Sequence, residues 1–219
     1  MDKKKIFAEF FGSLLLLLIV VGSGIMGEKL AGGNVAVALL ANALATGAGL
    51  YVLITVLGPV SGAHFNPAVT TYMRFRKQIS NEHWLAYMVV QTLGAILGVW
   101  LAHFIFEVPL FQISQHTRDG VPQMTSELVA TFGLLFTIAG FSRFQPTKTA
   151  MGVALYIVAA YWFTSSTSFA NPAVSIARCL TNTFSGIAPQ SLLGYVVGQS
   201  VAVGLFYFGE PLLFPKVGN

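Results

Sequence analysis

Long apolar stretches alternate with short polar breaks along the whole chain. The apolar stretches cover about residues 6–26, 35–57, 84–106, 124–141, 150–168 and 190–208. Each is close to the ~20 residues that an α-helix needs to cross the hydrocarbon core of a bilayer. The first follows three lysines, as in a secretory signal peptide, but it is longer than the roughly 7–15 residues of a signal core and lacks a clear cleavage site. The pattern therefore predicts an all-α membrane protein with six transmembrane helices.

The composition agrees with a membrane protein and excludes several other classes. Of the 219 residues, 55% are hydrophobic and 9% are charged, which is too apolar for an ordinary soluble domain. The net charge of +4 is spread over the ends of apolar runs rather than gathered in a patch, so no nucleic-acid partner is expected. A single cysteine, Cys179, excludes an internal disulfide and a structural zinc site. With no recognisable catalytic set, we expect no enzyme, no metal and no cofactor.

The basic residues lie mainly on one side of the predicted membrane. Sorting the 12 Lys and Arg residues into alternate loops puts nine on one side, namely Lys3, Lys4, Lys5, Arg74, Arg76, Lys77, Arg143, Lys148 and Lys216, and three on the other, namely Lys29, Arg118 and Arg178. Cytoplasmic loops carry the excess of positive charge. Both termini are therefore predicted to be cytoplasmic, with the chain in the cell (inner) membrane.

The second half of the sequence repeats motifs of the first. Residues 61–69, SGAHFNPAV, correspond to residues 166–174, STSFANPAV. Glu9 and Glu127 occupy matching places in the first span of each half, and Gln91 and Gln199 in the last. Each predicted repeat, about 1–110 and 120–219, carries three spans. Because three is odd, the two repeats must have opposite orientations in the membrane.

The two Asn-Pro-Ala segments are too short to cross the membrane. From Asn66 to Arg74 there are nine residues, or ~13 Å of helix. Asn is a good N-cap and Pro suits the first helical turn, so each segment is predicted to start a re-entrant half-helix. Inverted repeats bring the two N-termini together at mid-membrane, where they repel cations and donate to oxygens of neutral solutes. The predicted pore residues are Asn66, Pro67, Ala68, Asn171, Pro172 and Ala173.

These motifs, together with AEF at residues 8–10 and QTLGA at residues 91–95, resemble the major intrinsic protein family over nearly the whole chain. The resemblance implies six transmembrane helices plus two re-entrant half-helices, a pore in every subunit and a homotetramer in the lipid bilayer. It also implies that Glu9 and Glu127 brace the re-entrant loops. His64 is expected to brace a loop as well, with a pore-lining or gating role as the alternative.

The resemblance further points to a selectivity filter formed by Thr46, Ala159, Ser168 and Val174, if no gaps are assumed. Water-specific members place an aromatic residue, a His and an Arg at such positions, and this sequence has none of them there. A wider and less hydrophilic opening follows. In this respect the chain is similar to a bacterial branch linked to arsenical permeation. Arg178, one turn beyond Val174, either attracts solutes in an outer vestibule or ties down outer-loop carbonyls.

The sequence therefore predicts a passive channel for small uncharged solutes, such as trihydroxy arsenic, methylated arsenicals, glycerol and water. A water-selective channel and a non-conducting membrane structural protein remain open as alternatives. An ion-coupled transporter is disfavoured because the spans contain little titratable material besides Glu9 and Glu127.

Overall fold

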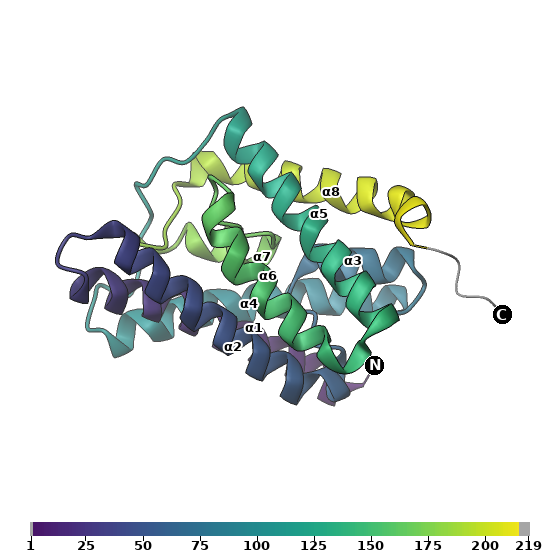
Figure 1. Ribbon diagram of the computed structural model, residues 1–219. Helices are drawn as coiled ribbons and strands as arrows, with labels where there is room; N and C mark the ends of the chain where they lie inside the picture. The colour runs from purple at the N-terminus through teal and green to yellow at the C-terminus, as the bar shows by residue number, and fades with distance from the viewer. Residues whose placement is uncertain (1, 215–219) are drawn as a thin grey trace.

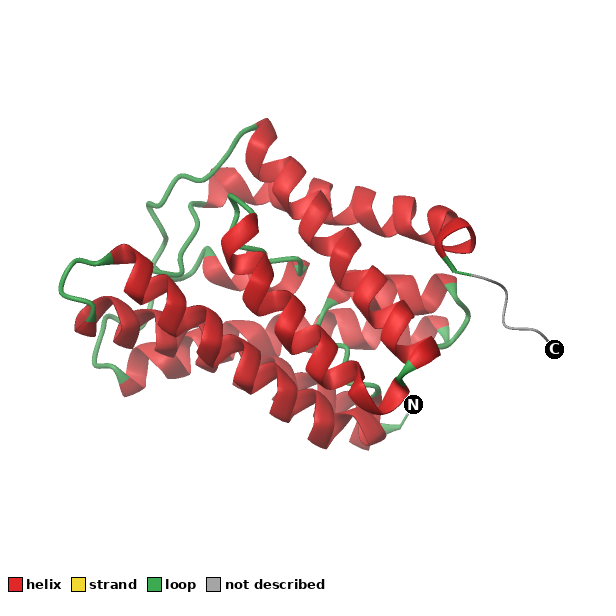
Figure 2. Ribbon diagram, viewed as in Figure 1, coloured by secondary structure: helices red, strands yellow, loops and turns green. Residues whose placement is uncertain are grey.

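The computed structural model describes residues 2–214, so Lys216 of the predicted cytoplasmic set lies outside the described residues. The described chain is helical, and Figure 2 draws no strand in it. Its elements are α1 (Lys3–Leu30), α2 (Val35–Ser61), α3 (Pro67–Phe75), α4 (Asn81–Ile105), α5 (Val121–Phe144), η1 (Pro146–Lys148), α6 (Thr149–Phe163), α7 (Pro172–Arg178), η2 (Pro189–Ser191) and α8 (Leu192–Leu213).

Helices α1, α2, α4, α5 and α8 are long and apolar enough to cross a membrane. The short helices α3 and α7, of 9 and 7 residues, lie between the long ones. In each half, two helices precede a short one and a long helix follows it, although α6 of the second half has only 15 residues. Both ends of the described chain lie at the same end of the molecule (Figure 1).

Helix α6 is shorter than its apolar pattern predicted. It has 15 residues and ends at Phe163, whereas the pattern extended to residue 168. Thr167 and Ser168 have φ angles of 60° and 50°, which cannot continue a right-handed helix. Residues 164–168 are all Ser or Thr, and Thr164 already has extended backbone angles, so the predicted span ran on into the loop that leads to α7.

In each half, glycines let one long helix pack closely against the backbone of another. A Cβ on Gly94 or Gly98 of α4 would collide with the backbone carbonyls of Phe10 and Leu14 in α1. In the second half, Gly198 of α8 lies in the same way against a backbone carbonyl of α5. Small residues let helices approach closely where lipid removes the hydrophobic drive for association.

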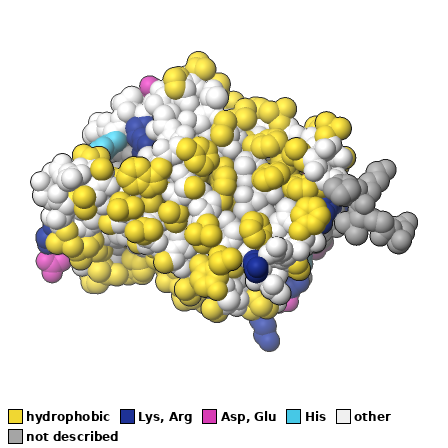
Figure 3. Space-filling model, in the orientation of Figure 1, with side chains coloured by type: hydrophobic (Ala, Val, Ile, Leu, Met, Phe, Trp, Pro, Cys, Tyr) yellow, Lys and Arg dark blue, Asp and Glu magenta, His cyan; other side chains and the backbone are white. Residues whose placement is uncertain are grey.

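The outer surface is apolar. Large hydrophobic side chains such as Leu44, Val56, Leu93 and Phe208 are between 52% and 79% exposed. Figure 3 shows hydrophobic side chains covering the middle of one face, with Lys and Arg toward its ends. Such a contiguous apolar surface suits contact with lipid rather than water.

Candidate functional site

Each half-helix begins at the Asn of an Asn-Pro-Ala segment. The Asn66 side-chain oxygen accepts the backbone N–H of Ala68 at 2.8 Å, and that of Asn171 accepts the N–H of Ala173 at 3.0 Å. Both Asn residues have extended backbone angles, and a proline follows each at the first helical position. The caps satisfy N–H groups that a helix start leaves without partners.

The two half-helices meet N-terminus to N-terminus. The Asn66 amide nitrogen donates to the Ala170 carbonyl at 2.7 Å, and the Asn171 amide nitrogen donates to the Phe65 carbonyl at 2.8 Å. Each side-chain amide has two N–H groups, so one remains on each after this bond. Asn66 and Asn171 both line the same cavity, so their second N–H groups can donate hydrogen bonds to a solute there.

The backbone just before each Asn is strained in the same way. Ala63 and Phe65 have φ angles of 49° and 48°, and Ser168 and Ala170 have 50° and 49°. Left-handed angles at non-glycine residues cost of order 1–3 kcal/mol each and persist only where the surroundings fix them. Both loops therefore need strong support from neighbouring elements.

Glu9 of α1 supports the first loop. Its carboxylate is fully buried and accepts the backbone N–H groups of His64 and Phe65 at 2.9 and 2.7 Å. Gln91 of α4 donates to the same carboxylate at 2.8 Å. The His64 ring lies 3.1 Å from the Thr70 hydroxyl and also lines the cavity, so His64 has contacts of both kinds that the sequence suggested.

Glu127 of α5 supports the second loop with matching contacts. It is also fully buried and accepts the N–H groups of Phe169 and Ala170 at 2.9 and 2.8 Å. Gln199 of α8 donates to it at 2.6 Å and to Ser175 at 2.9 Å. A buried carboxylate is stable only when several donors satisfy it, and these bonds provide them.

A cavity of about 110 Å³ runs between the half-helices and the long helices, and it has room for several water molecules. The long helices contribute residues spaced four apart, so each presents one face to it. These residues are Leu16 and Val20 of α1, Thr46, Leu50 and Ile54 of α2, Leu134 and Ile138 of α5, and Thr149, Val153, Ile157 and Tyr161 of α6.

The placement of Ala159 in the filter is wrong. Ala159 is exposed on the outer face of α6, while Tyr161 is buried and lines the cavity. Two residues correspond to about 200° around a helix, so a gap of two in the count moves the assignment to the opposite face. The spacing of Thr149, Val153, Ile157 and Tyr161 was the sequence signal that would have identified the inward face.

The other three predicted filter residues line the cavity. They are Thr46, Ser168 and Val174. The Thr46 hydroxyl lies 3.2 Å from the Tyr161 hydroxyl, so an aromatic residue stands where the sequence suggested only small side chains. The Ser168 hydroxyl is buried and has no partner among the described residues. This hydroxyl is free to bond a solute.

Arg178 lies in the cavity wall, with only 2% of its surface exposed. Its guanidinium donates to the Ser185 carbonyl and stacks 3.4 Å above the centre of the Phe169 ring. The bond to the Ser185 carbonyl is the kind of loop contact that the sequence analysis gave as one alternative for Arg178. Sequence reasoning missed Arg118, which donates to the Thr167 hydroxyl at 3.2 Å and lies 5.8 Å from the same ring.

No group of three His, Cys, Asp or Glu side chains within residues 2–214 is arranged to hold a metal ion.

Comparison with known proteins identifies relatives over most of the chain. The family model described as "Major intrinsic protein" matches residues 1–148. Aquaglyceroporin AqpS of Rhizobium meliloti is 50% identical over 192 residues, which are 88% of this chain and 82% of that protein. Probable aquaporin PIP2-8 of Arabidopsis thaliana is 34% identical over 67% of this chain and 54% of its own length. The crystal structure of the aquaglyceroporin from Plasmodium falciparum has a similar fold, with a TM-score of 0.69 and 20% identity over 96% of this chain and 97% of that one.

Proposed function

Because this chain belongs to the major intrinsic protein family and is a membrane channel for small neutral solutes rather than an enzyme, we propose that glycerol and solutes of similar chemistry pass between its two half-helices. The observation that carries the proposal is the cavity shared by both halves, with Asn66 and Asn171 in its wall. The relative that is 50% identical to this chain, AqpS, is named an aquaglyceroporin, which supports a solute of the glycerol class.

The cavity wall contains both polar groups and apolar side chains, which fits a small polyhydroxy molecule. The polar groups include the second amide N–H groups of Asn66 and Asn171 and the Ser168 hydroxyl, which has no partner among residues 2–214. Apolar residues such as Leu16 and Val20 also line the cavity. A solute that loses water on entering can bond its hydroxyls to the polar groups, and its carbon or metalloid centre can contact the apolar side chains. Trihydroxy arsenic and methylated arsenicals share this chemistry with glycerol.

We assign the selectivity filter to Thr46, Tyr161, Ser168 and Val174, with Arg178 beside them. Val174 supplies neither charge nor hydrogen-bond donors from its side chain, and it leaves more room than an arginine would. The positive ends of the half-helices, whose N-caps are Asn66 and Asn171, disfavour cations at the centre of the path. The pore is therefore wide and passive, and no ion gradient drives it.

We also propose that both termini face the cytoplasm from the inner membrane, and that four copies assemble into a homotetramer. The excess of Lys and Arg at one end supports the orientation. Assembly would cover part of the exposed apolar surface.

Stopped-flow light scattering on proteoliposomes tests the function, with water, glycerol and neutral trihydroxy arsenic compared with protein-free liposomes. We expect glycerol and trihydroxy arsenic to permeate faster than in the liposomes without protein, and a proton or sodium gradient to leave these rates unchanged. Water flux alone would favour the water-selective alternative. No flux of any solute from correctly folded protein would favour a structural role.

Replacing Arg178 with glutamine tests whether this residue acts on solutes. If its charge attracts polar solutes, uptake of an anionic or strongly polar solute should fall in a salt-sensitive way while glycerol flux stays constant. The bond to Ser185 gives the competing expectation, since a loop tie would lower all fluxes or the folded yield together. Equal loss for every solute would exclude the solute role.

A further inference from the structure

A second, polar pocket lies beyond the pore cavity, at the end of the molecule that holds both chain ends. It has a volume of about 370 Å³, and its polar lining consists of Tyr72, Arg76, Gln78, Ser142, Arg143 and Glu210. Met73 and Ile138 line both this pocket and the pore cavity, so the two spaces share a wall. We call the second pocket the inner-mouth pocket. A molecule bound there lies beside the path of a permeating solute.

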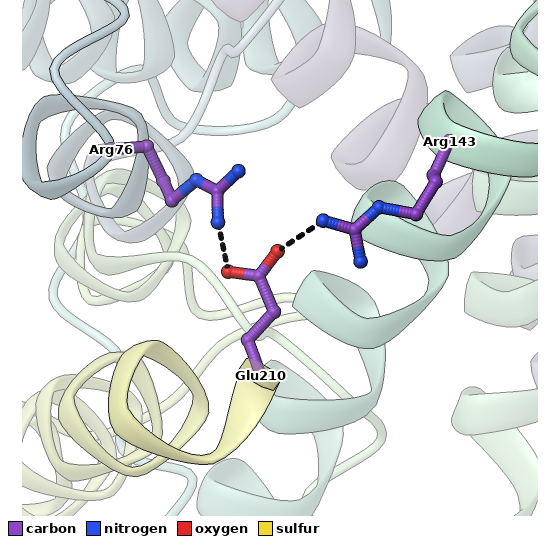
Figure 4. Close-up of polar contacts among 3 residues, drawn as sticks. All are labelled: Arg76, Arg143 and Glu210. Carbon is purple, nitrogen blue, oxygen red and sulfur yellow. Dashed lines mark hydrogen bonds and ion pairs between the residues drawn. The ribbon is translucent and has the colours of Figure 1, made fainter. Parts of the chain in front are cut away.

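Three charged residues from three elements meet in the inner-mouth pocket (Figure 4). Glu210 of α8 lies between the two arginines, with its carboxylate 2.7 Å from an Arg76 nitrogen and 3.5 Å from an Arg143 nitrogen. The side chain of Glu210 is only 4% exposed. One carboxylate faces two guanidinium groups, so the group keeps a net charge of +1.

Glu210 is satisfied mainly by Arg76, which leaves Arg143 with unused donors. A guanidinium has five N–H groups. Within residues 2–214, Arg143 makes only the long 3.5 Å ion pair and a cation–π contact with Phe214, 5.2 Å from the ring centre. One of its terminal nitrogens is buried without a hydrogen-bond partner among residues 2–214, and the side chain is 16% exposed. Unpaired donors on a largely buried cation are costly, and they call for a partner.

We infer that the inner-mouth pocket binds a small phosphate-type oxyanion between Arg143 and Arg76. A guanidinium pairs with phosphate oxygens in a planar, two-bond geometry that matches the donors left free on Arg143. Gln78, Ser142 and Tyr72 offer neutral donors around the same space. The net positive charge disfavours a cation, and the volume admits a tetrahedral anion. A bound anion narrows the path next to Met73 and Ile138, so it slows solute flux from that side.

The consequence for flux rests on the proposed channel function, whereas the binding does not. Binding is therefore measured first, by thermal unfolding of the purified full-length protein in sodium phosphate and in sodium chloride at equal ionic strength and pH. We expect phosphate to raise the unfolding temperature in a saturable way. Arg143→Gln should raise the apparent Kd for phosphate at least about tenfold, because a charged hydrogen-bond donor is lost.

Two further variants separate binding from folding. Lys148→Gln removes an exposed positive charge near the same end of the molecule and should leave the phosphate effect unchanged. Ser142→Trp keeps all three charged residues but fills the pocket from an exposed position, so it should remove the phosphate effect even if Arg143→Gln folds poorly. A phosphate effect of equal size in the Lys148, Ser142 and Arg143 variants would overturn the proposal.

The source of the oxyanion is tested in nanodiscs of phosphatidylcholine, with either free phosphate or phosphatidylglycerol added. An effect of free phosphate that depends on Arg143 identifies a soluble anion, and the same dependence for phosphatidylglycerol identifies a lipid headgroup. Stabilisation by neither would overturn the proposal. Glycerol flux measured with and without phosphate then shows whether the site regulates the pore. Absence of flux in both conditions would contradict the channel function while leaving the binding result intact.

Discussion

Replacing Val174 with arginine is expected to lower the ratio of glycerol to water permeability at least about tenfold, equivalent to ~1.4 kcal/mol of added barrier. Val174 lines the cavity of about 110 Å³, so a long charged side chain there takes up space that a polyol needs. The new guanidinium also lies one helical turn from Arg178 and adds a second positive charge to the same wall. Water is small enough to pass. Stopped-flow measurements on proteoliposomes give both permeabilities.

Ala159→Leu is the matched control for this substitution. It also adds bulk, but on the outer face of α6, so the permeability ratio should match that of the parent protein. If Val174→Arg passes glycerol and trihydroxy arsenic as fast as the parent does, residue 174 is not at the constriction. The assignment of the filter would then be incorrect.

Replacing Glu127 with alanine is expected to lower the free energy of unfolding by ~3–5 kcal/mol, because the buried N–H groups that donate to its carboxylate lose their acceptor. The backbone N–H groups of Phe169 and Ala170 would be left unpaired, and the Gln199 amide would keep only its bond to Ser175. Ala170 has a left-handed backbone angle that these bonds hold in place. We therefore expect a lower unfolding temperature in detergent and little flux from the protein that remains folded.

Glu82→Gln provides the comparison, because Glu82 is an exposed carboxylate in the first turn of α4. Its loss should change the unfolding temperature little, since surface electrostatic effects of this kind are worth a few tenths of a kcal/mol. A Glu127→Ala protein as stable and as permeable as the parent would contradict the supporting role of this carboxylate.

The fold was predictable because the pattern that carries it is strong. Apolar stretches of spanning length and a repeated nine-residue motif predicted the long helices, apart from the end of α6, and the two half-helices that start at Asn66 and Asn171. Ala159 shows where sequence reasoning failed. A filter residue on a long helix is defined by its angle around the helix axis, and counting back from Asn171 assumed a loop without gaps. The face of α6 had to be determined from its own spacing of four instead.

Contacts between distant segments were less accessible to sequence reasoning. Glu210 lies 134 residues from Arg76 along the chain, and no motif connects the two. The sequence placed Arg76 and Arg143 on the same side of the membrane, but it gave no distance between them. Arg118 likewise reaches the second re-entrant loop from the long connection between α4 and α5. Only the folded chain brings such residues together.

The bonds between each Asn amide and the opposite loop also imply an order of assembly during synthesis. Glu9 precedes the first loop by 55 and 56 residues, so it can brace that loop as soon as α3 has been made. The partner of the Asn66 amide, Ala170, comes 104 residues later. Because a membrane protein is made from its N-terminus, we expect the meeting of the two half-helices to be a late step of folding. The conducting path is completed only at that step. A partly synthesised chain therefore has no open pore through the membrane of the cell that makes it.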